Sequence, residues 1–396
     1  MKIAAVIAEY NPFHNGHAYQ IAELKKRGYD TVVCVMSGNT VQRGDFAITD
    51  KYTRAECALL GGADLVLELP YPYSASGAET FASAGVKIIS SIDADAICFG
   101  SESGDSERLR MVAETVLSKK FNDEYKSLYL TSMGTAEAYF EAYRRVSGED
   151  HPTGANDMLG VSYFKEIIKS RIGLYVEVIE RSGNDYREKD IENAEKNPSA
   201  TMLREFIYKN GFRDELRNLM PENVLFALKK SGKIHDVKRL DTGILSYFRI
   251  CDTLKFDLAD IYEAGGGLSE RIFNLSHRAR SYEELVSLVS GKKYTTARVK
   301  RAILHCLTGA LCSDVNTGIA YTTVLGFNEN GRKLLAEVRK KGSIPTVVKP
   351  SDAKDLGAYA IRQFELSRKI DSMYTLLSSD AEESGKYITS SPVIIK

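Results

Sequence analysis

The chain has 396 residues, 43% hydrophobic and 27% charged, so it is long enough for two folded domains and has an ordinary globular composition. Its formal net charge of zero excludes a chain that is basic throughout, and leaves any RNA contact to local patches. No run approaches the roughly 20 apolar residues of a membrane helix, so we expect no membrane partner. The composition leaves the oligomeric state open.

The first segment, residues 1–14, is a short apolar run that Glu9 interrupts before a proline and two histidines. This pattern favours a buried first strand over a signal peptide. The six cysteines include no CxxC pair, and we expect buried, reduced thiols. Both features lead us to expect a cytoplasmic protein.

Strand and helix signals alternate along the first half. Apolar, β-rich runs predict strands at residues 2–10, 31–36, 65–69, 96–100 and 174–181. Helical spacing predicts helices at 18–28, 52–62, 77–92 and 158–170, with a mostly helical segment at 106–146. Helices between strands imply βαβ crossovers, so we predict a Rossmann-like α/β domain with a parallel sheet over residues 1–215.

Polar, turn-like segments follow four of these strands. They are NPFHNGH, SGN, GSESGD and RSGNDYR. Because ligands of open α/β sheets bind beyond the carboxyl ends of the strands, these segments predict the binding site.

After about residue 215 the strand signal fades. Amphipathic helices are predicted at residues 221–232, 242–254, 282–291, 297–309, 332–342 and 358–370. We therefore expect a mostly α-helical second domain over residues 216–396.

The most informative chemistry is the pair His14 and His17 around Asn15-Gly16. We expect His17 to open the following helix, whose N-terminus attracts phosphate. Gly16 lets a phosphate approach the backbone. Two imidazoles three positions apart can donate hydrogen bonds to an α-phosphate as charge develops on it. The alternative is a pair of structural histidines at a turn.

This His-x-Gly-His segment resembles the HxGH signature of the nucleotidylyltransferase superfamily. A second signature of that superfamily resembles the segment Ser199-Ala200-Thr201-Met202-Leu203-Arg204. Ser199 would cap a helix and offer its hydroxyl to phosphate. Arg204, with Thr201, would contact the β- and γ-phosphates or the leaving pyrophosphate. An ordinary helix cap is the alternative.

Longer segments narrow the resemblance. AEYNPFHNGHAYQI, MSGNTVQRGDFAITDKYTRAECALLGGADLVLELP, FGSESGD, ANDMLG and SATMLR together resemble the tRNA(Met) cytidine acetate ligase family. The resemblance covers most of residues 1–210 and is weaker beyond. It implies that ATP, with Mg²⁺ as counter-ion, and acetate form acetyl-adenylate. The acetyl group would then pass to N4 of the wobble cytidine of elongator tRNA(Met).

The resemblance also implies the ATP contacts. They are Ile7, Ala8, Glu9, Tyr10, Asn11, Pro12, Phe13, His14, Asn15, Gly16, His17, Ala18, Tyr19, Gln20, Gly100, Asn156 and Arg181. The family often has two asparagines where this chain has Asn156-Asp157, which puts Asp157 in doubt as a ligand.

The turn after the second strand is a candidate acetate or phosphate site, with Ser37, Gly38, Asn39 and Arg43. A solvated turn is the alternative. Lys51 and Arg54 would add positive charge, unless they are solvated surface residues.

Glu102 and Asp105 follow the fourth strand. They are candidates for placing Mg²⁺ or a ribose hydroxyl. For Asp105, a helix cap is the commoner role.

Basic stretches in the second half are candidate tRNA contacts. The first contains Lys292, Lys293, Arg298, Lys300 and Arg301, with Tyr294 as a possible stacking partner for a base. The second contains Arg332, Lys333, Arg339, Lys340, Lys341 and Lys349. Solvated helix faces are the alternative. No spacing typical of metal ligands is present, so we expect no protein-bound metal.

Two other function classes remain open. A small-molecule adenylyltransferase would share the first two motifs, although such enzymes are usually shorter. A non-catalytic nucleotide- or RNA-binding protein would share the fold, although both motifs are intact here.

Overall fold

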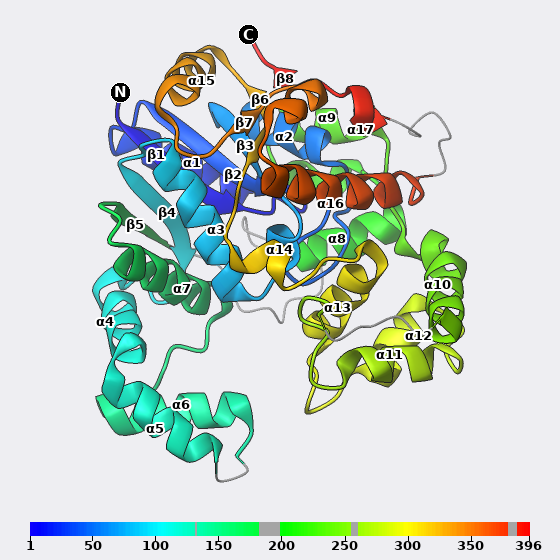
Figure 1. Cartoon of the computed structure of the whole chain (residues 1–396). Coiled ribbons are helices and arrows are strands. Elements are labelled where there is room, and N and C mark those ends of the chain that lie inside the picture. The colour runs from blue at the N-terminus through cyan, green and yellow to red at the C-terminus, as the bar shows by residue number, and fades with distance from the viewer. Residues whose placement is uncertain (131–132, 182–198, 255–259, 379–385) are drawn as a thin grey trace.

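One mixed sheet organises the molecule, with helices packed on both of its faces (Figure 1). The computed structural model describes residues 1–130, 133–181, 199–254, 260–378 and 386–396. The strands lie in the order β5-β4-β1-β2-β3-β6-β7, and β8 pairs with β6. Their bounds are β1 Ile3–Ala8, β2 Thr31–Ser37, β3 Leu65–Leu69, β4 Ala96–Ser101, β5 Tyr175–Glu180, β6 Thr322–Phe327, β7 Thr346–Val347 and β8 Val393–Ile394.

The first five strands are parallel, as the alternation of strand and helix signals predicted. The helices of this half are α1 Asn15–Lys26, α2 Lys51–Leu60, α3 Ala78–Ser91, α4 Ser106–Leu117, α5 Lys119–Tyr129, α6 Thr135–Ser147, α7 Ala155–Ser170 and α8 Ala200–Asn210. The first half is therefore the parallel α/β sheet domain expected from the sequence.

Alternate residues of the buried strands face opposite layers of the core. Ala5 and Ile7 of β1 pack with residues of α3, α4 and α7, whereas Ala4 and Val6 pack with residues of α1, α2 and α8. All six residues of β1 are at least half-buried, as is typical of a parallel strand covered by helices on both faces.

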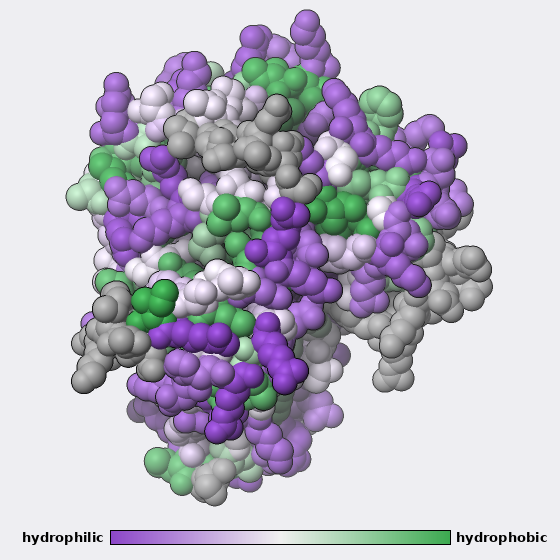
Figure 2. All heavy atoms as spheres, turned by 90° about the vertical axis from the view of Figure 1, so that its right-hand side faces the viewer, coloured by the Kyte–Doolittle hydropathy of each residue, from purple (hydrophilic) through white to green (hydrophobic). Residues whose placement is uncertain are grey.

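The second half is mostly helical, as expected. Its helices are α9 Glu222–Ser231, α10 Asp241–Leu254, α11 Leu268–Ser276, α12 Tyr282–Val289, α13 Thr296–Thr308, α14 Ser313–Asn316, α15 Glu329–Lys341, α16 Ala358–Thr375 and α17 Lys386–Thr389. Short 3₁₀ helices lie at Tyr73–Ala75, Asp214–Asn218, Val237–Leu240 and Pro350–Asp355. The face of the molecule at the right of Figure 1 is mostly hydrophilic, with small hydrophobic patches between the polar side chains (Figure 2).

The second half also contributes strands to the sheet, which the sequence did not predict. β6 lies antiparallel to β3, and Val324 and Leu325 of β6 are fully buried in the two core layers. The helices α10–α13 and α16 form a third apolar core that includes Phe46 and Tyr71 from the first half. The two halves of the sequence are therefore joined through both the sheet and the packing.

Candidate active site at the carboxyl edge of the sheet

The candidate site lies where the order of the strands reverses. β1 pairs with β2 on one side and with β4 on the other, so the chain runs outward through β2 and β3 and then returns to the opposite side of β1. In open α/β sheets, ligands bind beyond the carboxyl ends of the strands at such a reversal. Residues 9–17 leave β1 at this edge of the sheet, Gly100 lies in β4, and Arg181 follows β5.

His14 and His17 form a reciprocal cap at the start of α1. The Nδ1 atom of His14 accepts a hydrogen bond from the Gly16 amide at 3.1 Å, and Nδ1 of His17 accepts one from the His14 amide at 3.2 Å. An imidazole whose Nδ1 accepts must carry its proton on Nε2 when it is neutral. Both rings therefore have an Nε2–H group available as a donor. The helix begins at Asn15, so the expectation that His17 opens it was wrong by two residues.

The environment keeps both histidines neutral. Their rings stack with centroids 3.7 Å apart. Burial, with a smaller contribution from the positive charge of Arg181, lowers the pKa of His14 to about 3. Burial also lowers the pKa of His17 well below its usual value, assisted by His14 and Arg181. At neutral pH the pair donates hydrogen bonds without adding positive charge.

The second motif lies against the first. Ser199 caps α8 by accepting a hydrogen bond from the Met202 amide at 3.2 Å. Arg204, the fifth residue of that helix, donates from Nη1 to the backbone oxygen of Asn11 at 2.7 Å and from Nη2 to Thr201 Oγ1 at 3.1 Å. The fold thus brings HNGH and SATMLR together, although most of the RSGNDYR segment lies outside the described residues.

Gly100 and Arg181 are also neighbours. A Cβ atom at Gly100 would lie 3.2 Å from Cγ of Arg181, so the arginine side chain crosses the glycine. Arg181 is exposed, and its charge acts on both histidines. These contacts place two of the expected ATP residues beside the histidine pair.

Asn156 and its neighbours form a capping network. Glu102 Oε1 accepts hydrogen bonds from the backbone amide and from Nδ2 of Asn156, and Oε2 accepts from the Asp157 amide. The buried Asp157 carboxylate accepts from the hydroxyl of Ser101 and from the amides of Glu102 and Ser103. Glu102 and Asp157 are therefore committed to holding α7 against β4, and Asp105 caps α4.

The turn after β2 is held by buried cations. Arg54 donates to the backbone oxygens of Thr49, Glu9, Ser37 and Gly38. It is fully buried, so the alternative of a solvated surface residue is wrong.

Lys51 is 4% exposed and bridges two buried carboxylates. Its Nζ lies 2.9 Å from Oε1 of Glu68 and 2.8 Å from Oδ2 of Asp371 on α16. Asn39 donates to the other oxygen of Asp371 at 2.8 Å. Sequence reasoning missed Asp371, because no local pattern links a residue of α16 to a turn more than 300 positions earlier.

The four acetate or phosphate candidates are not equally accessible. Ser37, Gly38 and Asn39 are buried, whereas Arg43 is exposed. Arg43 also acts electrostatically on Glu9, so it lies near the first turn.

The first basic stretch contains both exposed side chains and side chains that are already paired within the protein. Lys292 and Lys293 are exposed. Lys300 pairs with Asp45, and the 9% exposed Arg301 pairs with Glu263 at 2.6 Å. Arg298, which is partly buried, donates to the backbone oxygens of Glu263 and Gly265. Part of α13 is therefore fixed against the QRGD turn of the first half.

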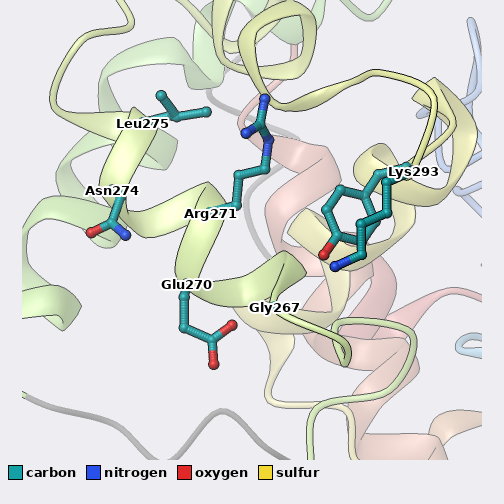
Figure 3. Close-up of a pocket in the computed structure, with 7 residues that line it drawn as sticks. Gly267, Glu270, Arg271, Asn274, Leu275 and Lys293 are labelled. Carbon is teal, nitrogen blue, oxygen red and sulfur yellow. The ribbon is translucent and has the colours of Figure 1, made fainter.

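A pocket of about 470 Å³ opens beside the exposed lysines (Figure 3). It is lined by Gly267, Glu270, Arg271, Asn274, Leu275, Lys293 and Tyr294. Tyr294 is 5% exposed and its hydroxyl donates to the Gly266 oxygen, which limits it as a stacking partner for a base.

The second basic stretch lies largely on α15, at the opposite edge of the sheet. Asn328, the N-cap of α15, donates from its backbone N–H to the backbone oxygen of Asp64, which precedes β3. Gly342, at the other end, lies beside Ser91 at the end of α3. These lysines and arginines are therefore remote from the histidine pair.

Three of the other four histidines are buried packing residues, whereas His277 is exposed. Nδ1 of His151 donates to the backbone oxygen of Pro152 at 2.7 Å, His235 stacks on Tyr374, and Nδ1 of His305 bonds to the Tyr71 hydroxyl at 2.6 Å. Five of the six cysteines are buried and all are free.

The residues that the structure describes contain no group of three or more His, Cys, Asp or Glu side chains arranged to hold a metal. Nor, among those residues, is any helix both long and apolar enough to cross a membrane.

Comparison with known proteins agrees with this arrangement. A family model described as HIGH Nucleotidyl Transferase matches residues 1–387. The tRNA(Met) cytidine acetate ligase of Acetivibrio thermocellus is 34% identical over 400 residues, and that of Caldanaerobacter subterraneus is 32% identical over 394; each match covers 95% of both chains. The chain belongs to the tRNA(Met) cytidine acetate ligase family.

Solved structures support the same family. Thermotoga maritima TmcAL bound with alpha-thio ATP matches with a TM-score of 0.90, and the apo form matches with 0.91. Both are 26% identical and are covered completely by the match, as is this chain. This member of the family therefore has the same overall arrangement as a relative that binds an ATP analogue.

Proposed function

We propose that this protein is an ATP-dependent ligase that forms acetyl-adenylate and transfers the acetyl group to N4 of the wobble cytidine of elongator tRNA(Met). Family membership supports this reaction. The observation that carries it is the neutral histidine pair, with Arg181 and Arg204 beside it, at the reversal of strand order. That arrangement suits adenylyl transfer because its donors face the position where phosphate charge develops.

In the first step, an acetate oxygen attacks the α-phosphorus of ATP and pyrophosphate leaves. Nε2–H groups of His14 and His17 stabilise the charge on the α-phosphate, and Ser199, Thr201 and Arg204 bind the departing pyrophosphate. Residues 7–20 with Gly100, Asn156 and Arg181 enclose the nucleotide. Mg²⁺ accompanies ATP as its counter-ion, and Arg43 attracts the anionic substrate to the turn after β2.

The helical second part, residues 216–396, provides a candidate surface for tRNA. Lys292 and Lys293 are the exposed cations of the first basic stretch and suit phosphate contacts. The other three cations of this stretch would support that surface by holding α13 against the first half of the chain; they are Arg298, Lys300 and Arg301. We propose a cytoplasmic location, where tRNA and ATP are available.

The test is ATP–pyrophosphate exchange with purified protein, with and without acetate, for the wild type and His17→Ala. Exchange that requires acetate and disappears in the variant supports carboxylate adenylylation at HNGH. Exchange without acetate favours a small-molecule adenylyltransferase. RNA binding without any exchange, even after elongator tRNA(Met) is added, favours a non-catalytic protein.

A further inference from the structure

Glu9 is an unusual residue for a nucleotide site. It directly follows β1 and lies five positions before His14, inside the segment that resembles an ATP-binding loop. A carboxylate repels phosphate oxygens, so ATP binding by itself gives no reason for a glutamate there. Its contacts indicate a different partner.

One oxygen of the Glu9 carboxylate is held and the other is open. Oε1 accepts a hydrogen bond from the Gln42 amide at 2.9 Å. The Glu9 backbone oxygen accepts from Nη1 of the buried Arg54 at 2.6 Å, which fixes the main chain. Oε2 accepts no hydrogen bond from the residues that the structure describes, and the side chain is partly exposed. The carboxylate is thus oriented with an acceptor left for a ligand.

The surroundings make this carboxylate a better base than an ordinary glutamate. Burial raises the pKa of Glu9, and the Gln42 amide and the charges of Arg204, Arg43 and Arg54 offset only part of that effect. Arg204 and Arg43 belong to the pyrophosphate and acetate candidates. Glu9 therefore lies among the groups that would surround the acetyl-adenylate.

The other carboxylates at this edge of the sheet already have hydrogen-bond or ion-pair partners within the protein, or lie farther from β1. Glu68 is paired with Lys51, and both oxygens of Glu102 and of Asp157 accept hydrogen bonds within the capping network. Glu180 ends β5 and lies against Gly104, on the side of β4 away from β1. Among these groups, Glu9 is the one with an open oxygen that lies near Arg204 and Arg43.

We propose that the Glu9 carboxylate accepts a hydrogen bond from the N4 amine of the target cytidine and takes its proton during acetyl transfer. This inference rests on the proposed function. A carboxylate is the usual side-chain acceptor for the exocyclic amine of cytosine. N4 attacks the acetyl carbon of acetyl-adenylate and forms the C–N bond, and the bond from that carbon to the phosphate oxygen breaks. AMP leaves with the electron pair, and one N4 proton passes to Glu9 and then to solvent.

The test separates the two steps in Glu9→Gln, whose amide oxygen can still accept from the Gln42 amide. Single-turnover acetyl transfer to tRNA from pre-formed acetyl-adenylate should fall about 10²–10⁴-fold. Because Glu9 also lies in the expected ATP loop, acetate-dependent ATP–pyrophosphate exchange is measured on the same variant, and transfer should fall at least about 10-fold more than exchange. Wild-type transfer should slow at acidic pH as Glu9 is protonated, and this dependence should be lost in Glu9→Gln. Glu23→Gln, on α1, is the matched control and should resemble the wild type.

The outcomes distinguish this inference from the function on which it rests. If the wild type shows no acetate-dependent exchange and no transfer, the proposed function itself fails. If the wild type performs both steps and Glu9→Gln transfers acetyl at the wild-type rate, or loses exchange to the same degree as transfer, only the role of Glu9 is overturned. Glu9→Asp, which keeps a carboxylate, should retain more transfer activity than Glu9→Gln and provides the same comparison if Glu9→Gln does not fold.

Discussion

Arg204 donates from Nη1 to the backbone oxygen of Asn11 at 2.7 Å, across 193 positions of sequence. The side-chain oxygen of the same asparagine accepts from the Ile48 amide at 2.9 Å. The turn after β1 is therefore held from α8 on one side and from the loop before α2 on the other. Because Arg204 is also the expected pyrophosphate contact, the residue that would bind the leaving group also positions the loop that carries His14.

Replacement of Arg204 by lysine should therefore impair chemistry more than folding. Lysine keeps the charge but cannot reproduce the two directed N–H groups that reach Asn11 and Thr201. We expect acetate-dependent exchange to fall about 10²-fold, by analogy with loss of one charge-stabilising donor. Arg213→Lys, on the exposed loop after α8, is the control and should keep its exchange rate; equal rates in the two variants would contradict this role.

The buried histidine pair should make stability sensitive to acid. The pKa of His14 is about 3 in the folded protein, whereas its ordinary value is 6.5. Between these two pH values the imidazole is therefore protonated in the unfolded chain but neutral in the folded chain. The contribution to stability is present above the ordinary pKa and is lost as the pH falls toward 3. His14→Asn keeps an acceptor suited to the helix cap but does not titrate. The measurement is the free energy of unfolding in urea at pH 7 and at pH 4.5. Between these two pH values, His14→Asn should lose less stability than the wild type. The control His277→Asn, at an exposed position, should lose as much stability as the wild type.

Lys51→Met should be strongly destabilising. Removal of the ammonium leaves Glu68 and Asp371 buried without their shared partner, and loss of one member of a buried ionic cluster typically costs about 3–5 kcal/mol. Adding Asp371→Asn should recover part of that loss, because it removes one of the uncompensated charges. Lys87→Met, where the lysine is 41% exposed and its carboxylate partner 3.8 Å away, should change the free energy of unfolding by less than about 1 kcal/mol.

Sequence patterns predicted the first half of the fold well, because its strands are continuous apolar runs and its helices are amphipathic. The strand at 65–69 has the predicted bounds, and α2, α3 and α13 begin and end within two residues of prediction. The two sequence motifs also lie at helix N-termini, where each depends on local capping chemistry.

The contacts between distant segments were not predictable in the same way. β6 lies between helical patterns, and its pairing with β3 identifies it as a strand of the sheet. Lys51 and Arg54 have the sequence appearance of surface residues, and their burial depends on Asp371 and on four carbonyl oxygens that no local pattern brings together. Arg301 likewise has the appearance of an RNA contact but pairs with Glu263.

The shared sheet leads to a prediction about the two halves. A chain ending at residue 215 would lack β6, leaving β3 as an unpaired edge and exposing apolar residues such as Leu67. It would also lose His305 and Thr308, which bond to the buried Tyr71 hydroxyl at 2.6 and 2.8 Å. We expect the isolated segment 1–215 to aggregate or to unfold without a cooperative transition, and co-expression with a separate chain of residues 216–396 to restore a soluble complex. A cooperative thermal transition for 1–215 alone would show instead that the first half folds independently, and that β6 and the contacts of Tyr71 only add to a core that is already sufficient.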